Sequence, residues 1–200
     1  MVEAREAFAV IVAGPSGSGK TTLARRAVER DDKLRFSVSD TSRPRRGKEV
    51  EGRDYRFRTE AEFEKRIEEG AYAEWARVHG DYYGTPRSEI DGAASDGVNL
   101  LLDIDVQGAE QVRAAYGSAV AIFIVPPSWE VLERRLRNRG TDSEERIRTR
   151  LRNAEVELEK KFSYDYIVVN DDLEAALDAF LSIIRAERCR AERLTESAAS

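Results

Sequence analysis

The chain has 200 residues and a formal net charge of −5; 41% of its residues are hydrophobic and 36% are charged. This composition is typical of a single globular domain that carries small inserted subdomains, and it excludes a mainly disordered chain. The acidic balance argues against a general nucleic-acid-binding protein, and no apolar run approaches the roughly 20 residues that span a membrane.

The first predicted elements are a buried strand over 7–13 and a helix over 22–30, and a phosphate-binding pattern lies between them. The glycines of Gly-x(4)-Gly-Lys-[Ser/Thr] let successive backbone N–H groups point at phosphate oxygens where a helix begins. Lys20 can reach the β- and γ-phosphates, and the Thr21 hydroxyl can ligate Mg²⁺. The segment predicted to bind the triphosphate consists of Gly14, Pro15, Ser16, Gly17, Ser18, Gly19, Lys20, Thr21 and Thr22.

The next part of the chain, about 37–90, is predicted to form a small β-rich insert. A strand over 34–39 leads into a basic stretch, 43–58, that is broken by proline and glycine. Its last residues, 54–58, alternate aromatic and charged side chains, which indicates a half-exposed strand.

The second half of the insert opens with a capping box at Thr59 and Glu62, which predicts the start of a helix. Gly70 is placed to end that helix. A strand is predicted over 71–78, and the glycines that follow predict a turn over 80–85.

Three later apolar runs, 98–105, 119–125 and 166–170, are predicted to be strands, and the first of them is expected to be covered on both faces. Because helical patterns separate them, the chain is predicted to be an α/β protein with a parallel sheet. The acids that end the first of these runs fall where ligands bind in open α/β sheets.

The helical segments of the second half follow the same signals. One helix is predicted from about 128 to a break at 138–140, and a capping box at Thr141 and Glu144 opens a long second helix. The last helix carries apolar residues at helical spacing over 173–184. The tail after about residue 190 is expected to be frayed.

Two groups of arginines, one early in the insert and one after the strand predicted over 119–125, indicate which class of phosphate-binding protein this is. Arginine forks stabilise the charge that builds up on phosphate oxygens, so one group could hold a phosphorylated acceptor and the other a donor. Most of these arginines fit solvated helix faces equally well, but Arg43 and Arg46 lie in a loop, which favours a functional role. The groups are Arg43, Arg45 and Arg46, and then Arg134, Arg135, Arg139, Arg146 and Arg150.

In the order and spacing of its motifs, the chain resembles the guanylate kinases from about residue 7 to 190. Together these motifs are specific, because they recur in the family's order along nearly the whole chain. The segments beyond the phosphate loop are 37–46 (SVSDTSRPRR), Glu49-x-x-Gly52-x-x-Tyr55, 74–76 (EWA), 82–85 (YYGT), 103–108 (DIDVQG), Arg137-x-Arg139-Gly140-Thr141 and 169–172 (VNDD).

The resemblance implies transfer of the γ-phosphoryl group of Mg-ATP to GMP in purine nucleotide metabolism, without a covalent enzyme intermediate. It also implies a three-layer α/β/α core, a small β-rich insert that binds the nucleoside monophosphate, and a helical lid that bears arginines. The implied boundaries are 1–36, 91–127 and 160–190 for the core, 37–90 for the insert, and about 128–159 for the lid.

The chemistry of one residue agrees with a guanine acceptor. Guanine presents two donors side by side, N1–H and the 2-amino group, and a carboxylate such as Glu74 can accept from both. Adenine has no such pair, and a site of this kind discriminates by up to about 10⁴–10⁵.

The remaining roles are those that the resemblance implies. The GMP-binding residues are Ser39, Arg43, Arg46, Tyr55, Glu74, Tyr83, Thr85 and Asp105. The catalytic residues are Lys20, Arg46, Arg135, Arg139 and Arg150, and Asn170 and Asp171 lie near the adenine. Thr21 ligates Mg²⁺, and Asp103 either holds it through water or only orients Arg or Thr side chains.

The chain departs from the family pattern in the loop that grips the acceptor phosphate. Arg45 stands where the family has proline and Lys48 where it has glycine, with Gly47 shifted one place earlier. Because Arg43 and Arg46 keep their spacing, we expect the grip to survive.

Three alternatives stay open at this point. One is a related kinase that uses another small phosphorylated acceptor; another is a binding module that has lost activity, against which the complete phosphate loop argues. The third is a nucleic-acid-binding protein that uses 43–58, against which the net charge argues. The sequence leaves open the oligomeric state and the use of dGMP.

The cysteine and histidine content sets the expected compartment. Cys189 is the single cysteine, so no intrachain disulfide can form, and the polar N-terminus does not read as a signal peptide. We therefore expect a cytoplasmic protein, with no membrane partner. Cys189 and His79 are too few for a structural zinc site.

Overall fold

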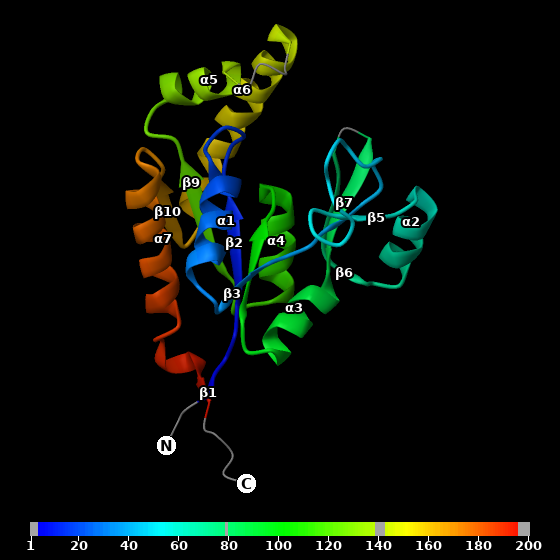
Figure 1. Cartoon of the computed structure of the whole chain (residues 1–200), viewed down its shortest axis with the longest axis vertical. Helices are drawn as coiled ribbons and strands as arrows, with labels where there is room; N and C mark the ends of the chain where they lie inside the picture. The colour runs from blue at the N-terminus through cyan, green and yellow to red at the C-terminus, as the bar shows by residue number, and fades with distance from the viewer. Residues whose placement is uncertain (1–3, 79, 139–142, 196–200) are drawn as a thin grey trace.

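A five-stranded parallel sheet forms the centre of the computed structural model, which describes residues 4–78, 80–138 and 143–195 (Figure 1). The strand order is β3–β8–β2–β9–β10, so the strand that precedes the phosphate loop is the central one. The predicted α/β class with a parallel sheet is confirmed. The strands are β2 (Ala9–Ala13), β3 (Leu34–Phe36), β8 (Asn99–Asp103), β9 (Val120–Val125) and β10 (Tyr166–Val169).

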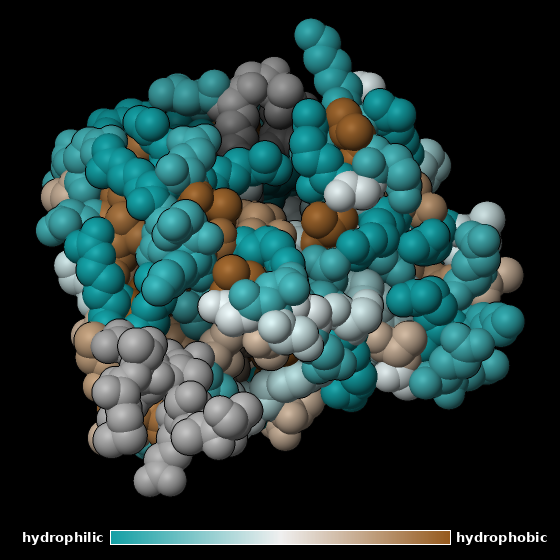
Figure 2. All heavy atoms as spheres, turned by 60° about the horizontal axis from the view of Figure 1, so that its bottom comes forward, coloured by the Kyte–Doolittle hydropathy of each residue, from teal (hydrophilic) through white to brown (hydrophobic). Residues whose placement is uncertain are grey.

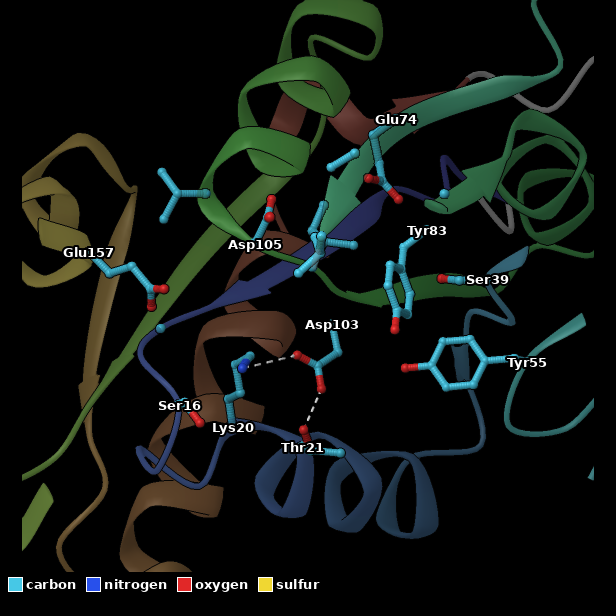
Figure 3. A pocket seen from close by; sticks show the side chains of 16 residues that line it. Ser16, Lys20, Thr21, Ser39, Tyr55, Glu74, Tyr83, Asp103, Asp105 and Glu157 are labelled. Atoms are coloured by element: carbon cyan, nitrogen blue, oxygen red, sulfur yellow. Dashed lines mark hydrogen bonds and ion pairs between the residues drawn. The ribbon is translucent and has the colours of Figure 1, made fainter. Parts of the chain in front are cut away.

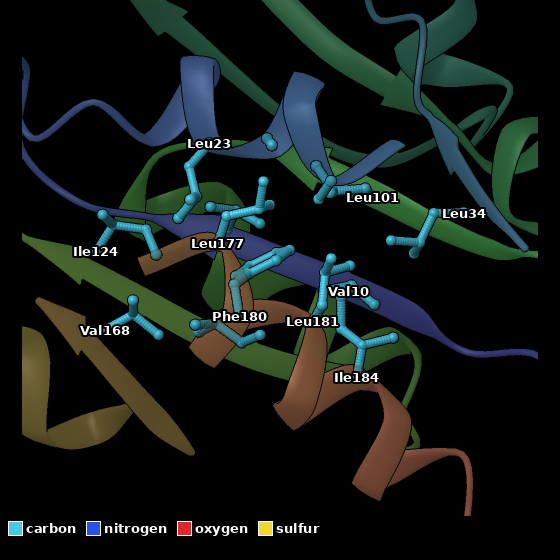
Figure 4. Packing of buried hydrophobic residues seen from close by; sticks show 14 of the residues in the cluster. Val10, Leu23, Leu34, Leu101, Ile124, Val168, Leu177, Phe180, Leu181 and Ile184 are labelled. Atoms are coloured by element: carbon cyan, nitrogen blue, oxygen red, sulfur yellow. The ribbon is translucent and has the colours of Figure 1, made fainter. Parts of the chain in front are cut away.

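Helices cover both faces of this sheet, because successive side chains of each strand point to opposite sides. On one face Val10 and Val12 pack with α1 and α7, where Phe180 is fully buried (Figure 4). On the other face Ile11 packs with α3 and α4. The three-layer core is confirmed, with helices α1 (Lys20–Arg30), α3 (Arg87–Ser95), α4 (Val106–Ala115) and α7 (Leu173–Glu187).

A second, four-stranded sheet lies to one side of the core, in the order β5–β4–β7–β6 (Figure 1). Its small core stacks the ring of Phe63 from α2 against Tyr72 and Tyr82, with ring centroids 4.4 and 5.1 Å apart. The elements are β4 (Asp40–Thr41), β5 (Arg56–Phe57), α2 (Glu60–Glu68), β6 (Tyr72–Val78) and β7 (Asp81–Pro86).

Two predictions for this region were wrong. The segment 80–85 was expected to be a turn, yet β7 begins at Asp81 and pairs antiparallel with β6. The strand expected over 34–39 ends at Phe36, and the chain then enters the second sheet at Asp40. The predicted capping box at Thr59 and the end of the helix at Gly70 are confirmed.

Above the phosphate loop, two helices form an arm, α5 (Trp129–Arg137) and α6 (Glu144–Glu159), and a short 3₁₀ turn, η1 (Lys160–Ser163), follows them. They pack through Leu132, Leu136 and Ala154. The predicted cap Thr141 lies outside the described residues. The described cap of α6 is Ser143, whose hydroxyl accepts from the backbone N–H of Arg146.

The two ends of the described chain meet at the foot of the molecule (Figure 1). Strand β1 (Ala4–Arg5) pairs antiparallel with β11 (Leu194–Thr195), which follows a 3₁₀ turn, η2 (Ala191–Arg193). The expectation of a frayed tail from about residue 190 was therefore wrong as far as Thr195.

The face of the molecule shown in Figure 2 is mainly hydrophilic, and its hydrophobic side chains form small, separate patches. Within the described ranges, none of the helices combines the length and the apolar character needed to cross a bilayer.

Candidate active site

A cavity of about 420 Å³ separates the phosphate loop from the second sheet (Figure 3). It lies at the carboxyl ends of β2 and β8, where ligands bind in open α/β sheets. One side comes from the loop and α1, another from β6 and β7, and the floor from the residues that follow β8. The charged and hydrogen-bonding side chains that line it are Ser16, Lys20, Thr21, Ser39, Tyr55, Glu74, Tyr83, Asp103, Asp105 and Glu157.

The phosphate loop takes a conformation that depends on glycine. Gly14, Gly17 and Gly19 all have positive φ, at 144°, 95° and 87°. A Cβ atom on Gly14 would lie 2.3 Å from the carbonyl oxygen of Ile124. The residue that caps α1 is Gly19, which has no side chain to bond to the helix. The backbone N–H groups of the first turn can therefore donate to a bound anion.

Asp103, at the end of β8, is bonded to both functional side chains of the loop (Figure 3). The Thr21 hydroxyl donates to one carboxylate oxygen of Asp103 at 2.5 Å, and Lys20 Nζ lies 3.7 Å from the other. The strand and the helix therefore deliver two oxygen ligands and one cation to the same end of the cavity.

This donor set fits a magnesium ion that is shared with a nucleotide. Mg²⁺ at such sites takes one or two protein oxygens and completes its shell with phosphates and water. The oxygens of Thr21 and Asp103 supply that number. Across the described residues there is no cluster of three or more acidic, histidine or cysteine side chains that could hold a metal alone.

Three of the predicted residues support the phosphate loop without lining the cavity. Asn170 Nδ2 donates to the carbonyl oxygen of Ser18 at 2.8 Å. Arg135 donates to the carbonyl oxygens of Asn170 and Ser18, at 3.0 and 3.4 Å. Arg150 donates to the hydroxyl of Ser16 at 2.9 Å, so α5 and α6 are both tied to the loop.

Across the cavity, Glu74 of β6 is only 6% exposed, so it presents a carboxylate in a buried setting. The Thr85 hydroxyl donates to its Oε1 at 2.6 Å, and the Ser39 hydroxyl lies 3.4 Å from that of Thr85. Burial raises the pKa of Glu74 to about 7; the hydrogen bond from Thr85 opposes this shift and the charge of Asp105 adds to it. These three side chains thus form one polar wall. Glu74 and Ser39 line the cavity, and Thr85 of β7 is buried beside them.

Arg43 is buried beside this wall. Its guanidinium forms a bidentate pair with Glu49 at 2.6 and 2.8 Å, donates to the Tyr83 hydroxyl at 3.1 Å and lies over the ring of Tyr55 at 4.9 Å. The hydrogen-bonded pairing raises the pKa of Arg43 and lowers that of Glu49. The arginine is therefore a fixed cation between two phenol rings that reach the cavity.

Other predicted residues are not gathered into the cavity. The Arg46 side chain is exposed, and the backbone of Arg46 bonds to Glu49: its N–H donates to the Glu49 carboxylate at 2.8 Å and its carbonyl oxygen accepts from the Glu49 N–H at 3.1 Å. Thr22 and Asp171 are exposed, and neither lines the cavity. Arg139 lies outside the described residues.

Sequence reasoning missed two acidic residues here. Glu157 of α6 lines the cavity (Figure 3), and burial raises its pKa while the charge of Lys20 opposes that shift. Glu49 was noted only as part of a motif, although it orients Arg43. No pattern in the sequence indicates Glu157, because the long helix α6 carries many charges and only its contact with the cavity distinguishes this one.

Comparisons with known proteins agree along nearly the whole chain. The family model described as guanylate kinase matches residues 6–187. The chain is 48% identical over 194 residues to the guanylate kinase of Syntrophotalea carbinolica, and the match covers 97% of this chain and 92% of that protein. It is 46% identical over 183 residues to the guanylate kinase of Thermotoga maritima, covering 92% and 88%. The crystal structure of guanylate kinase from Anaplasma phagocytophilum is similar with a TM-score of 0.80 and 34% identity, over 97% of this chain and 93% of that one.

Proposed function

Since this chain belongs to the guanylate kinase family, we propose that it phosphorylates GMP to GDP with ATP as the phosphoryl donor. ATP and GMP are accordingly its two substrates.

The observation that carries this function is the position of Glu74 across the cavity from a complete phosphate loop. A buried carboxylate with neighbouring hydroxyls suits a base that offers two adjacent donors and one acceptor, which is the edge of guanine. The ionised carboxylate would accept from N1–H and the 2-amino group, and the Ser39 hydroxyl would donate to O6, with Thr85 beside it holding the carboxylate. AMP would leave the carboxylate unpaired, and that is the source of the selectivity.

The acceptor phosphate fits the other part of the same wall. Arg43 and the hydroxyls of Tyr55 and Tyr83 would hold it, and Arg46 would join them by turning in from its exposed position. Asp105 would position the nucleotide from the floor of the cavity. The acceptor oxygen would then face the phosphate loop, ready for an in-line transfer with no covalent enzyme intermediate.

On the donor side, the loop glycines, Lys20 and the start of α1 would bind the β- and γ-phosphates of ATP. Thr21, with Asp103 through water, would hold Mg²⁺, which when bound neutralises charge on the phosphate oxygens. Asn170 and Asp171 would lie beside the adenine. The bonds from Arg135 and Arg150 to the loop support their role in stabilising the transferring phosphoryl group, together with Arg139.

The division of the chain follows from these roles. We assign residues 1–36, 91–127 and 160–190 to the core, 37–90 to the GMP-binding insert and about 128–159 to the lid. Closure of the insert and the lid would exclude water, which would otherwise hydrolyse ATP. We place the protein in the cytoplasm, in keeping with a single cysteine in 200 residues.

The test is ADP production from Mg-ATP by the purified protein with GMP, AMP, CMP, dTMP or no acceptor. Fast turnover with GMP alone among these is the expected result. Turnover with a different acceptor, or none with any of them, would contradict the proposal, and ATP binding measured alone would then distinguish another kinase from an inactive binding module.

A further inference from the structure

Strand β6 is the edge strand of the second sheet, and its outer backbone groups face α4 of the core. The side-chain amide of Gln111, on α4, fills the place of a missing neighbouring strand. Its Oε1 accepts from the backbone N–H of Trp75 at 3.2 Å, and its Nε2 donates to the Trp75 carbonyl oxygen at 2.9 Å. One side chain thus satisfies both outer backbone groups of the residue that follows Glu74.

The same face of α4 also sets the position of the Glu74 carboxylate. Gly108 precedes Gln111 by three residues, so the two lie on one side of the helix. A Cβ atom on Gly108 would lie 2.7 Å from Glu74 Oε2, which means that the carboxylate rests against bare backbone. The Gly108 N–H is itself held by Asp105 at 2.8 Å.

Ala73 of β6 packs with Ala109 and Val112 of α4, but the contact between the two elements leaves a space on one side. A cavity of about 490 Å³ lies beside the contact, lined by Trp75 and Gln111 and by residues of α2 and α4. Strand alternation sends Glu74 toward the candidate active site and Trp75 toward this second cavity. The Gln111 amide therefore makes directional bonds at a point where side chains leave space.

We propose that Gln111 is a positioning residue that sets guanine specificity, by fixing strand β6 so that the Glu74 carboxylate stands at the right depth against Gly108. This inference rests on the proposed function, because it assumes that Glu74 reads guanine. Gln111 itself bonds to the backbone of Trp75 and does not line the candidate active site.

The experiment compares GMP with inosine monophosphate, which lacks the 2-amino group, by measuring kcat/KM for each acceptor at saturating Mg-ATP. Gln111→Met keeps the length of the side chain and removes both bonds. The ratio of kcat/KM for GMP to that for inosine monophosphate should fall roughly tenfold, as expected when about one hydrogen bond is misaligned. The KM for ATP should stay unchanged.

Gln111→Glu should have a similar effect, because it keeps the shape but places an oxygen against the Trp75 carbonyl. The matched control is Gln107→Met, on the same helix, where the side chain is exposed. In a Glu74→Gln background, Gln111→Met should change the ratio less than about twofold, since the two residues would act as one unit.

The outcomes distinguish the proposed function from the positioning role of Gln111. If the unaltered protein does not phosphorylate GMP, the proposed function fails. If it does and Gln111→Met leaves the ratio of the two acceptors intact, even with both rates lowered, the role of Gln111 is only structural and the inference is overturned. Thermal unfolding of each variant establishes that the rates refer to folded protein.

Discussion

Glu74 is a buried acid whose nearest partner is a hydroxyl, Thr85, and not a cation. Such an environment favours the neutral form, so the residue is poised to change its charge close to neutral pH. The same environment that destabilises the free carboxylate makes it a strong acceptor once two guanine N–H groups face it. If Glu74 reads guanine as proposed, the selectivity and the pH dependence of the protein share one physical origin.

The first prediction concerns stability. The pKa of Glu74 is about 7 in the folded protein against a usual 4.5, so its neutral form stabilises the fold fully below pH 4.5. That contribution, about 3 kcal/mol, is lost as pH rises toward 7 and stays absent above it. Urea unfolding across this range should show the loss, and Glu74→Gln should remove it. Parallel curves for the two proteins would contradict the assignment.

The second prediction concerns proton release. Binding of GMP should favour the ionised form of Glu74, so about half a proton per GMP should be released at pH 7. Calorimetric titration in two buffers with different ionisation enthalpies measures this number. The Glu74→Gln variant is the control and should release none from this site; equal release from both proteins would assign the proton to another group.

The third prediction separates the two halves of the cavity. Lys20→Ala should lower kcat by about 10³ or more, because it removes a cation that stabilises the transferring phosphoryl group. The dissociation constant of GMP should change little, since Lys20 contacts Asp103 on the loop side. Lys33→Ala, an exposed lysine outside the cavity, serves as control. A matching loss of GMP affinity would show that the two halves are not independent.

At the scale of single residues, the sequence was informative where a motif carried the chemistry. The phosphate loop, Glu74 and Arg43 were all predicted, and all lie at one cavity or beside it. Motifs could not indicate that Arg135 would contact the back of the loop or that Glu157 would line the cavity. Both depend on how α5 and α6 cross the loop, which only the tertiary packing determines.

At the scale of elements, the phosphate loop shows why α1 starts where it does. Gly19 takes φ of 87°, and a Cβ atom there would lie 2.3 Å from Asn170 Nδ2. The start of the helix is therefore shaped by Asn170, which follows the edge strand β10, as well as by the local sequence.

The fourth prediction uses this contact. Gly19→Ala should destabilise the fold by about 1–3 kcal/mol and weaken ATP binding, because it strains the backbone and displaces the Asn170 amide from Ser18. Gly117→Ala is the matched control, since no atom lies within 4 Å of its added Cβ. Urea unfolding and ATP titration of both variants measure the difference. Equal, small effects would mean that the loop adapts without cost.

The strands show which element-level predictions can succeed. The three inner strands of the main sheet, β2, β8 and β9, could be predicted because nearly all their residues are buried and their apolar runs are unbroken. Strand β7 could not, because its glycines read as a turn: Gly80 has φ of 95°, whereas Gly84 lies within the strand. A Cβ atom on Gly84 would lie 2.9 Å from the Glu74 carbonyl and 3.1 Å from the Phe63 ring, so this glycine serves close packing.

At the scale of the whole molecule, the first and last residues that the structure describes are fixed to the core at the foot of the sheet. Arg193 is 4% exposed; it lies over the Phe8 ring at 3.9 Å and donates to the Ser118 carbonyl and to buried Glu187. Arg193, near the end of the described chain, therefore covers the core at the end of the sheet that is farthest from the phosphate loop.

The fifth prediction tests this closure. Arg193→Met should lower the free energy of unfolding by about 3 kcal/mol, because it leaves the buried carboxylate of Glu187 without its buried cation. Activity at 25 °C should be retained, since the change is remote from the cavity. Arg190→Met, at a half-exposed arginine, should cost less than about 0.5 kcal/mol. A loss of equal size in both variants would assign the effect to surface charge.

The pairing of β1 with β11 also brings the two ends of the described chain side by side. Ala4 and Thr195 are register partners. If the protein were inserted into a loop of a host protein, its two connections to the host would therefore lie close together. Both connections would lie at the end of the molecule opposite the arm formed by α5 and α6 (Figure 1). The paired ends of the described chain and the candidate active site therefore lie at opposite ends of the main sheet, an arrangement that suits insertion into another protein.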